Sequence, residues 1–271
     1  IAPTDDADNV AVEREEIPLD YIRPDLGDVL ARRGLTLDEN RPASVARRRK
    51  TNQRTVRENV DDLIDEGSFV EYGPLVVAAQ RRRRSVEDLL TRSPADGLVT
   101  GVGKVNGDLF DDPHCRAAVM AYDYTVFAGT QGVHNHWKTD RLLDIAEQGR
   151  MPLILFAEGG GGRPGDTDYG GFVGQNTFHH FGKLSGLVPM IGIVSGRCFA
   201  GNAALLGVCD VIIATADTNL GMGGPAMVEG GGLGVFRPED IGPMSVQVPN
   251  GVVDIPVADE TEAVAVAKRY L

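Results

Sequence analysis

The sequence predicts an α/β protein with a largely parallel β-sheet. Short apolar runs typical of buried strands alternate with stretches of helical spacing over the second half of the chain. Glycine clusters, drawn from 34 glycines in 271 residues, stand where strands should give way to helices. The hydrophobic share of 42% is enough to bury a sizeable core in one or two domains.

The amino-terminal stretch differs from the rest. Residues 1–50 are highly charged and poor in apolar side chains, which predicts a polar tail or linker. Prolines recur in it at Pro3, Pro18, Pro24 and Pro42. We expect the folded domain to cover residues 51–271.

The body should open with a helix and antiparallel strands. Residues 56–64 follow helical spacing. A strand is predicted at 98–105, and Asn106-Gly107 behind it is a typical hairpin turn. A further strand is predicted at 116–127.

Strands and helices then alternate. The predicted helices cover residues 133–148, 172–185, 202–208 and 260–271. The predicted strands cover residues 152–157, 190–194 and 211–215. This alternation indicates strand–helix–strand units and therefore a parallel sheet.

Two glycine-rich loops follow apolar strands, at 158–166 (EGGGGRPGD) and 196–204 (GRCFAGNAA). Each is a tight strand–helix turn, and one such turn alone needs no ligand. Two of them at successive strand ends would aim free backbone N–H groups at one point. That arrangement can hold an oxyanion, such as a thioester oxygen that gains charge.

Other sites are disfavoured by spacing. Gly160, Gly162 and Gly165 match G-x-G-x-x-G, but no acidic residue lies between Asp168 and Asp210, where a dinucleotide site needs one. The same gap argues against paired-carboxylate catalysis on these elements. No G-x-S-x-G elbow of a serine hydrolase is present.

Bulk properties narrow the function further. A net charge of −12 disfavours nucleic acid as a partner, and no run of 18 apolar residues indicates a membrane span. No signal peptide is visible, and the three cysteines form no C-x-x-C pair, so we expect a reducing cytoplasm and no metal site. Cys198 is interpreted as a packed small residue.

Some polar residues have two interpretations. His134 and His136 are better explained as a solvated helix start than as the lining of a ligand tunnel. The basic runs Arg47–Lys50 and Arg81–Arg84 are interpreted as exposed surface or subunit contact, with contact to phosphates as the alternative. Arg163 has a structural interpretation, tying its loop to the surroundings.

The two loops and other segments resemble a known family. Residues 57–71 (RENVDDLIDEGSFVE) and 123–132 (DYTVFAGTQG), followed by the two glycine loops, resemble in this order the amino-terminal half of acyl-CoA carboxylase carboxyltransferases. Residues 251–254 with the helix that follows resemble the end of that half. The resemblance covers about residues 51–271.

The resemblance implies a crotonase-like fold, the ββα spiral of the ClpP/crotonase class. It also implies carboxyl transfer from carboxybiotin to the α-carbon of an acyl-CoA. In this family the amino-terminal lobe binds acyl-CoA and a homologous carboxyl-terminal lobe binds biotin, which a separate domain or subunit carries. Backbone amides hold the enolate, and the biotin ureido nitrogen acts as base. The implied partners are that second lobe, the biotin carboxyl carrier and biotin carboxylase components, and further copies in a homo-oligomer.

The family motifs imply site residues on the matching positions. The implied catalytic amides are those of Gly160, Gly161, Gly201 and Asn202. The implied substrate-binding residues are Gly129, Thr130, Gly132, Gly159, Gly162, Arg163, Ala200 and Ala203.

Several positions depart from the family pattern. Glu158 replaces its usual Asp, Gly159 its Ser, and Asn202 a second Gly, which brings a side chain near the site. Ala204 stands where hydratases of the crotonase class have a catalytic glutamate, which argues against hydration.

Two rival functions stay open. One is a stand-alone decarboxylase or thioesterase, and the other is a non-catalytic lobe that binds CoA or a partner subunit. We expect no second pair of strand–loop–helix turns after Leu220, and the chain ends where the biotin half should begin. The chain alone should therefore transfer no carboxyl group.

Overall fold

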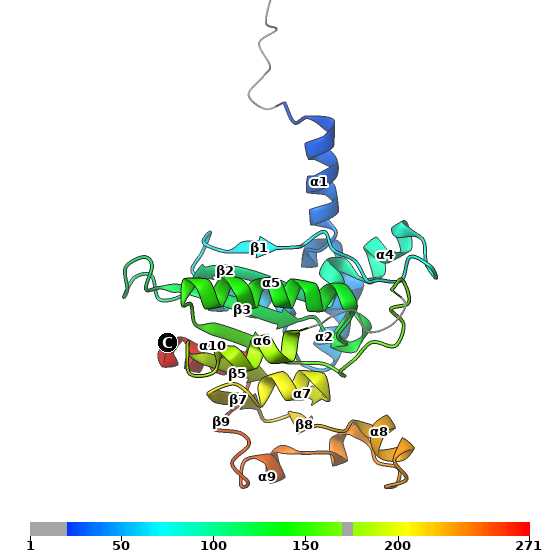
Figure 1. Cartoon of the computed structure of the whole chain (residues 1–271), viewed down its shortest axis with the longest axis vertical. Helices are drawn as coiled ribbons and strands as arrows, with labels where there is room; N and C mark the ends of the chain where they lie inside the picture. Colours follow the sequence, from blue (N-terminus) through cyan, green and yellow to red (C-terminus); the bar gives the residue numbers. More distant parts are fainter. Residues whose placement is uncertain (1–20, 170–175) are drawn as a thin grey trace, which may run out of the picture.

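The computed structural model describes residues 21–169 and 176–271. Its centre is a seven-stranded sheet in the order β1-β2-β3-β4-β5-β7-β9 (Figure 1). The strands are β1 (Val70–Tyr72), β2 (Leu98–Lys104), β3 (Arg116–Tyr122), β4 (Leu153–Phe156), β5 (Met190–Val194), β7 (Val211–Thr215) and β9 (Ile255–Val257). A second, two-stranded sheet pairs β6 (Arg197–Phe199) with β8 (Asn219–Gly221).

Most of the main sheet is parallel, as the sequence predicts. Strands β3, β4, β5, β7 and β9 run parallel to one another. Strand β2 is antiparallel to both of its neighbours, β1 and β3. The predicted hairpin exists, but residues 105–115 connect its strands. Asn106 takes a left-handed φ of 58° at the start of this longer loop.

Helices cover both faces of the sheet. They include α3 (Val56–Leu63), α4 (Val86–Arg92), α5 (Val133–Gly149), α6 (Thr177–Leu184), α7 (Gly201–Leu206) and α10 (Glu260–Tyr270). Alternate side chains of β4 enter different cores: Leu153 and Leu155 pack with α5 and α6, whereas Ile154 packs with α3 and α10. The sheet is therefore the middle of three layers.

The predicted elements agree well with the observed ones. Strands β5 and β7 have the predicted bounds, and α5 and α10 differ from theirs by one residue. The strand predicted at 116–127 was too long, because the chain turns after Tyr122 and forms a 3₁₀ helix at Phe127–Gly129. The helix predicted at 172–185 begins at Thr177, and residues 170–175 lie outside the described part.

The amino-terminal stretch is largely helical from residue 24 onward, unlike a tail. Helix α1 (Pro24–Gly34) stands away from the body, whereas α2 (Pro42–Lys50) packs against the body (Figure 1). The amino-acid composition did not indicate that α2 packs on the body, because the contact is an ion pair. Arg48 of α2 is buried and pairs with Glu158 of the body. The domain boundary near residue 51 stays a prediction.

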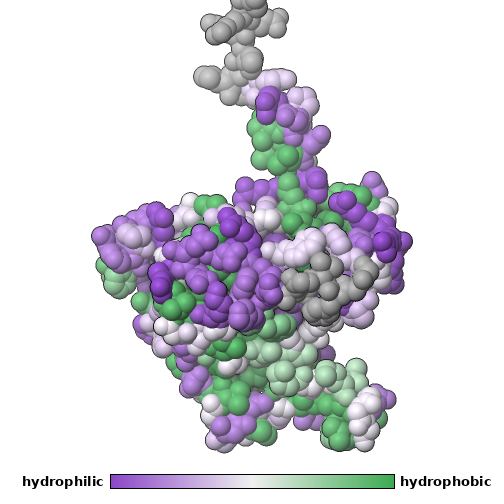
Figure 2. Space-filling model, in the orientation of Figure 1, coloured by the Kyte–Doolittle hydropathy of each residue, from purple (hydrophilic) through white to green (hydrophobic). Residues whose placement is uncertain are grey.

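The chain after β8 forms a glycine-rich ledge, which we define as residues 222–252. At Gly223-Gly224 the chain does pass from a strand, β8, to a helix, α8 (Pro225–Gly230), which the sequence analysis did not expect. The glycines at 230–232 lie at and after the end of α8 and not after a strand, so the described residues contain no second pair of such turns here. The ledge continues through a 3₁₀ helix at Pro238–Asp240 and α9 (Met244–Gln247). Figure 2 shows apolar surface in this lower region. Among the described residues, no helix is long and apolar enough to cross a membrane.

Candidate active site

The two glycine loops meet at one edge of the sheet. They follow β4 and β5, whose carboxyl ends share that edge because the strands are parallel. The Phe199 N–H donates to Gly159 O at 2.8 Å, and the Gly159 N–H donates to Arg197 O at 2.9 Å. The loops therefore lie side by side, as the sequence indicates.

A third segment, residues 127–132, completes the arrangement. The Gln131 N–H donates to Gly161 O at 2.7 Å, and the Arg163 N–H donates to Gln131 O at 2.8 Å. The Gln131 side chain is buried and donates to the Tyr122 hydroxyl. Sequence analysis did not single out Gln131, although its neighbours Thr130 and Gly132 were expected at the site.

Arg163 ties the first loop to the rest of the site. Its guanidinium pairs with the buried Asp96, donates to Thr130 O at 2.8 Å and stacks 5.0 Å from the centre of the Phe127 ring. These contacts confirm the structural interpretation of Arg163. Contact with substrate stays a prediction.

Asn202 has a side chain with no exposed surface, and it spans three segments. Its Oδ1 accepts from the Gly161 N–H at 3.0 Å. Its Nδ2 donates to Gly129 O at 3.2 Å and to Glu158 O at 3.3 Å. The departure from the family's usual glycine thus adds a cross-link between loops.

The expected amide donors fall into two groups. The Gly161 N–H donates to Asn202 Oδ1, and the Gly160 N–H donates to Ala128 O at 3.2 Å. Within residues 21–169 and 176–271, the N–H groups of Gly162, Gly201 and Asn202 have no hydrogen-bond acceptor. Among the described residues, the second group is therefore available to a ligand without breaking a hydrogen bond.

The loops open on a cavity of about 540 Å³. Of the residues predicted for the site, Gly132, Gly162, Arg163 and Gly201 line it. The others do not: Gly129, Thr130, Gly159, Gly160, Gly161, Ala200, Asn202 and Ala203. Ala200, immediately before α7, has a φ of 52°, so the second loop is strained where it presents Gly201.

The cavity wall also contains residues that the sequence analysis missed. His136, Tyr169 and Phe178 line it. The interpretation of His136 as part of a solvated helix start was wrong, because the side chain is buried and its Nδ1 lies 2.9 Å from Thr177 Oγ1. Burial lowers the pKa of His136. Its position four residues after Gly132, on α5, was the available sequence clue.

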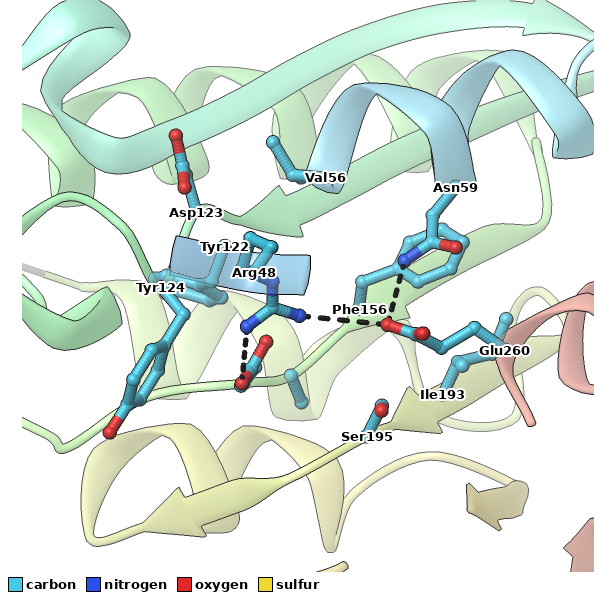
Figure 3. A pocket seen from close by; sticks show the side chains of 12 residues that line it. Arg48, Val56, Asn59, Tyr122, Asp123, Tyr124, Phe156, Ile193, Ser195 and Glu260 are labelled. Carbon is cyan, nitrogen blue, oxygen red and sulfur yellow. Dashed lines mark hydrogen bonds and ion pairs between the residues drawn. The ribbon is translucent and has the colours of Figure 1, made fainter. Parts of the chain in front are cut away.

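Behind the first loop lies a small, enclosed polar cavity of about 20 Å³. Arg48 from α2 donates to Glu158 at 2.8 Å and lies 3.5 Å from Glu260 of α10. Figure 3 shows the Arg48 guanidinium directed toward Glu260, with Asn59 on the same carboxylate. Burial raises the pKa of Glu158 to about 7, and the nearby Arg48 charge opposes that rise. These carboxylates do not line the larger cavity.

A basic groove of about 760 Å³ runs along the other side of α5. Its wall combines Arg32, Arg81 and Arg141 with the rings of Tyr72 and Trp137. Within the basic run Arg81–Arg84, Arg84 instead pairs with Asp88 on α4. Only Arg81 of that run lines the groove, among the residues that the structure describes.

Cysteine and metal chemistry have little support in the described part of the chain. Cys198 is fully buried, and burial raises the pKa of its thiol, which agrees with a packed small residue. No cluster of three metal-ligating side chains occurs among residues 21–169 and 176–271.

A mixed sheet with helices on both faces, and two loops that present backbone amides at its edge, defines a crotonase-like domain. A family model described as the carboxyl transferase domain matches residues 47–271. The chain belongs to this carboxyltransferase family, as the sequence resemblance implied.

Individual relatives agree. The chain is 29% identical over 227 residues to the propionyl-CoA carboxylase beta chain of Cereibacter sphaeroides, which covers 82% of this chain and 42% of that protein. It is 28% identical over 228 residues to the mitochondrial methylcrotonoyl-CoA carboxylase beta chain of Dictyostelium discoideum, covering 80% and 36%. The chain therefore spans less than half the length of these relatives.

Solved structures confirm the fold. A single-chain, multi-domain long-chain acyl-CoA carboxylase superposes with a TM-score of 0.89 at 59% identity, over 93% of this chain and 25% of that one. The transcarboxylase 12S hexamer core superposes with a TM-score of 0.75 at 23% identity, over 93% and 47%.

Proposed function

We propose that this chain is the acyl-CoA-binding lobe of a biotin-dependent acyl-CoA carboxyltransferase. One observation carries the proposal. Gly162 and Gly201, one from each glycine loop, line the same cavity, and their N–H groups have no acceptor among the described residues. Two preorganised donors from facing loops suit a thioester oxygen that becomes an enolate oxygen.

This pair modifies the set that the resemblance implied. Gly201 keeps its catalytic assignment, and Gly162 moves from substrate binding to oxyanion stabilisation. Gly160 and Gly161 are less suitable, since a ligand would have to displace Ala128 O or the Asn202 side chain. The Asn202 N–H is also unused, but Asn202 does not line the cavity.

Among the described residues that line the cavity, none offers a free carboxylate to act as base. The one acidic side chain in that lining, Asp166, accepts from the Val133 N–H at 3.0 Å and lies 3.5 Å from Arg163. As the resemblance implies, we assign the proton from the α-carbon to the ureido nitrogen of the co-substrate. Carboxybiotin, held by a second lobe, supplies the carboxyl group when it is bound. This chain holds the thioester, orients its α-carbon and stabilises the charge on its oxygen.

The substrate is proposed to be a long-chain acyl-CoA. The 59% identity to a long-chain acyl-CoA carboxylase supports this class, and Phe178 and Val133 give the cavity an apolar wall. The cations and aromatic rings of the basic groove suit the phosphates and adenine at the other end of CoA.

The partners are proposed to be a carboxyl-terminal lobe, a biotin carboxyl carrier and a biotin carboxylase component, within a homo-oligomer in the cytoplasm. The exposed apolar side chains of the ledge support docking of another lobe. They are Met222, Met227, Leu233, Val235, Phe236, Val246 and Val252, exposed by between 39% and 80%.

The test is carboxyl transfer from carboxybiotin to palmitoyl-CoA, with and without a matching carboxyl-terminal lobe. We expect product only when both lobes are present. Gly201→Pro removes the N–H and should lower turnover about 10²–10³-fold. Gly201→Ala is the matched control: its Cβ meets the Gln131 side chain as the proline ring does, but its N–H remains.

Equal turnover of the folded Pro and Ala variants would remove Gly201 from the mechanism. Transfer by the chain alone would contradict the two-lobe assignment. Decarboxylation or thioester hydrolysis without any second lobe would favour the rival stand-alone enzyme. Absence of both activity and CoA binding would favour the non-catalytic lobe.

A further inference from the structure

Every hydrogen-bonding group of the Asn202 side chain has a partner. Its one acceptor atom receives the Gly161 N–H, and its two donor hydrogens have Gly129 O and Glu158 O within reach. An ideal Cβ at Gly159 would lie 2.5 Å from Asn202 Nδ2, so the surrounding backbone is packed tightly on this amide. A buried carboxamide with every hydrogen bond made is costly to alter.

These contacts fix the two peptide planes that flank the Gly161 Cα: Asn202 holds the 160–161 peptide, and Gln131 holds the 161–162 peptide. Gly161 is held at its N–H by Asn202, and at its carbonyl oxygen by the Gln131 N–H at 2.7 Å. In a trans peptide the carbonyl and the following N–H point in opposite directions. Because Gly161 O accepts from the Gln131 N–H, the Gly162 N–H of the same peptide points away from that N–H, and Gly162 itself lines the cavity.

The same loop is held from its other end. The backbone oxygen of Glu158 accepts from Asn202, while its carboxylate accepts from Arg48 at 2.8 Å. Glu158 is therefore fixed by α7 on one side and by α2 on the other. The first loop is left with little freedom to rotate its amides.

We propose that Asn202 is a positioning residue that does not itself line the cavity. Its side-chain amide fixes the 160–161 peptide, and so holds in place the loop that presents the Gly162 N–H. The inference rests on the proposed function, because it assigns that N–H to the thioester oxygen. Asn202 acts through Gly161 and is not a catalytic residue. Its own backbone N–H need not contact substrate.

Asn202→Asp tests the inference with almost no change of shape. The carboxylate still accepts from Gly161 but loses both donors, and it faces Gly129 O and Glu158 O with like partial charge. We expect kcat for carboxyl transfer, with the second lobe present, to fall about 10–100-fold. The KM for acyl-CoA should change less than about threefold, because the groove that suits the nucleotide is untouched.

Asn219→Asp is the matched control. Asn219 is also buried, and its Nδ2 donates to two backbone carbonyls, Glu239 O at 3.1 Å and Ile241 O at 3.3 Å, away from the cavity. This variant carries a similar structural penalty but should keep kcat within about threefold of wild type. Similar kcat values for the two folded variants would overturn the positioning role.

A second measurement does not depend on turnover. It tests the inference even if the Asn202→Asp variant does not fold. Asn202→Ala removes the amide and frees the Gly161 N–H, so the hydrogen exchange of that amide should accelerate at least about tenfold. Unchanged Gly161 exchange would overturn the inference while leaving the proposed function intact. An inactive wild-type pair of lobes with fast exchange in Asn202→Ala would instead contradict the proposed function alone.

Discussion

Two regions of this molecule are rich in glycine, and some of their glycines are packed very differently, although Gly242 on the ledge is as crowded as any glycine of the site loops. In the site loops an added Cβ would collide with neighbours: at Gly161 it would lie 2.6 Å from Ala200 Cβ, and at Gly196 it would lie 2.9 Å from Glu158 Oε1. On the ledge, a Cβ at Gly230 or Gly232 would meet no atom within 4 Å. The loops need glycine for close packing, and these ledge positions do not.

Polar and apolar side chains follow the same division. The site loops are held by buried groups that reach from distant segments, namely Arg48, Arg163 and Asn202. The ledge instead exposes large apolar groups such as Leu233 (74%) and Val235 (80%). Glycine content therefore indicates where the chain turns, but it does not distinguish the two regions. Buried polar side chains that hold the loops mark a preorganised site, whereas exposed apolar side chains mark a surface suited to binding another protein lobe.

The largest effect is expected from the support behind the first loop. Arg48→Met leaves the buried carboxylates of Glu158 and Glu260 without their shared cation. Loss of one partner from a buried pair should lower the free energy of unfolding by about 3–5 kcal/mol. Urea unfolding followed by circular dichroism measures this change. Arg47→Met, at the exposed neighbour, should stay within about 0.5 kcal/mol of wild type.

The Arg48 effect should also depend on pH. Burial already raises the pKa of Glu158 to about 7, and removal of the opposing cation raises it further. A carboxyl with a folded-state pKa above its unfolded value contributes stability below the unfolded pKa, which is lost as pH rises through the folded pKa. The deficit of Arg48→Met should therefore be larger near pH 8 than near pH 5. An equal deficit at both values would show that the ion pair is not its cause.

A smaller effect tests the glycine comparison directly. Gly159→Ala places a methyl group against Gly129 O and Asn202 Nδ2, at a backbone φ of 155°. We expect a loss of about 1–3 kcal/mol in the free energy of unfolding. Gly230→Ala, at the end of α8 in open space, should be neutral or stabilise slightly, by up to about 1 kcal/mol. Equal losses at both positions would mean that the two regions do not differ in packing.

Much of the fold was predictable from local patterns. Apolar runs located β5 and β7 at their bounds, and helical spacing located α5 and α10 within one residue. Helices α1 and α2 were missed because their sequence is polar, and the buried ion pair of Arg48 joins residues 110 positions apart. Local composition contains no information on such a contact.

The site was predictable only in part. Glycine loops after successive strands indicated the edge of the sheet at which the two loops meet, and the resemblance indicated Gly201. The direction of each N–H was not predictable, because it depends on long-range partners such as Gln131 for the 161–162 peptide. A side chain was expected near the site at Asn202, but the sequence did not indicate that it is buried and joins the loops to one another. The orientation of a side chain at a loop–helix junction depends on segments far away in sequence.

The smallest effect is expected on the ledge. Its exposed apolar side chains suit the binding of another protein lobe and not of a small ligand. Leu233 is 74% exposed beside other apolar groups, so burial against a second lobe would remove that surface from water. Leu233→Asp should weaken association with a carboxyl-terminal lobe about tenfold, measured by titration calorimetry, with no change in unfolding free energy beyond about 0.5 kcal/mol. The matched control is Leu109→Asp, since Leu109 is 70% exposed on the loop between β2 and β3, outside the ledge. If both variants bind the lobe like wild type, the ledge is not its docking surface. If Leu109→Asp alone weakens binding, the docking surface lies at the hairpin loop, and the exposed apolar groups of the ledge need another explanation.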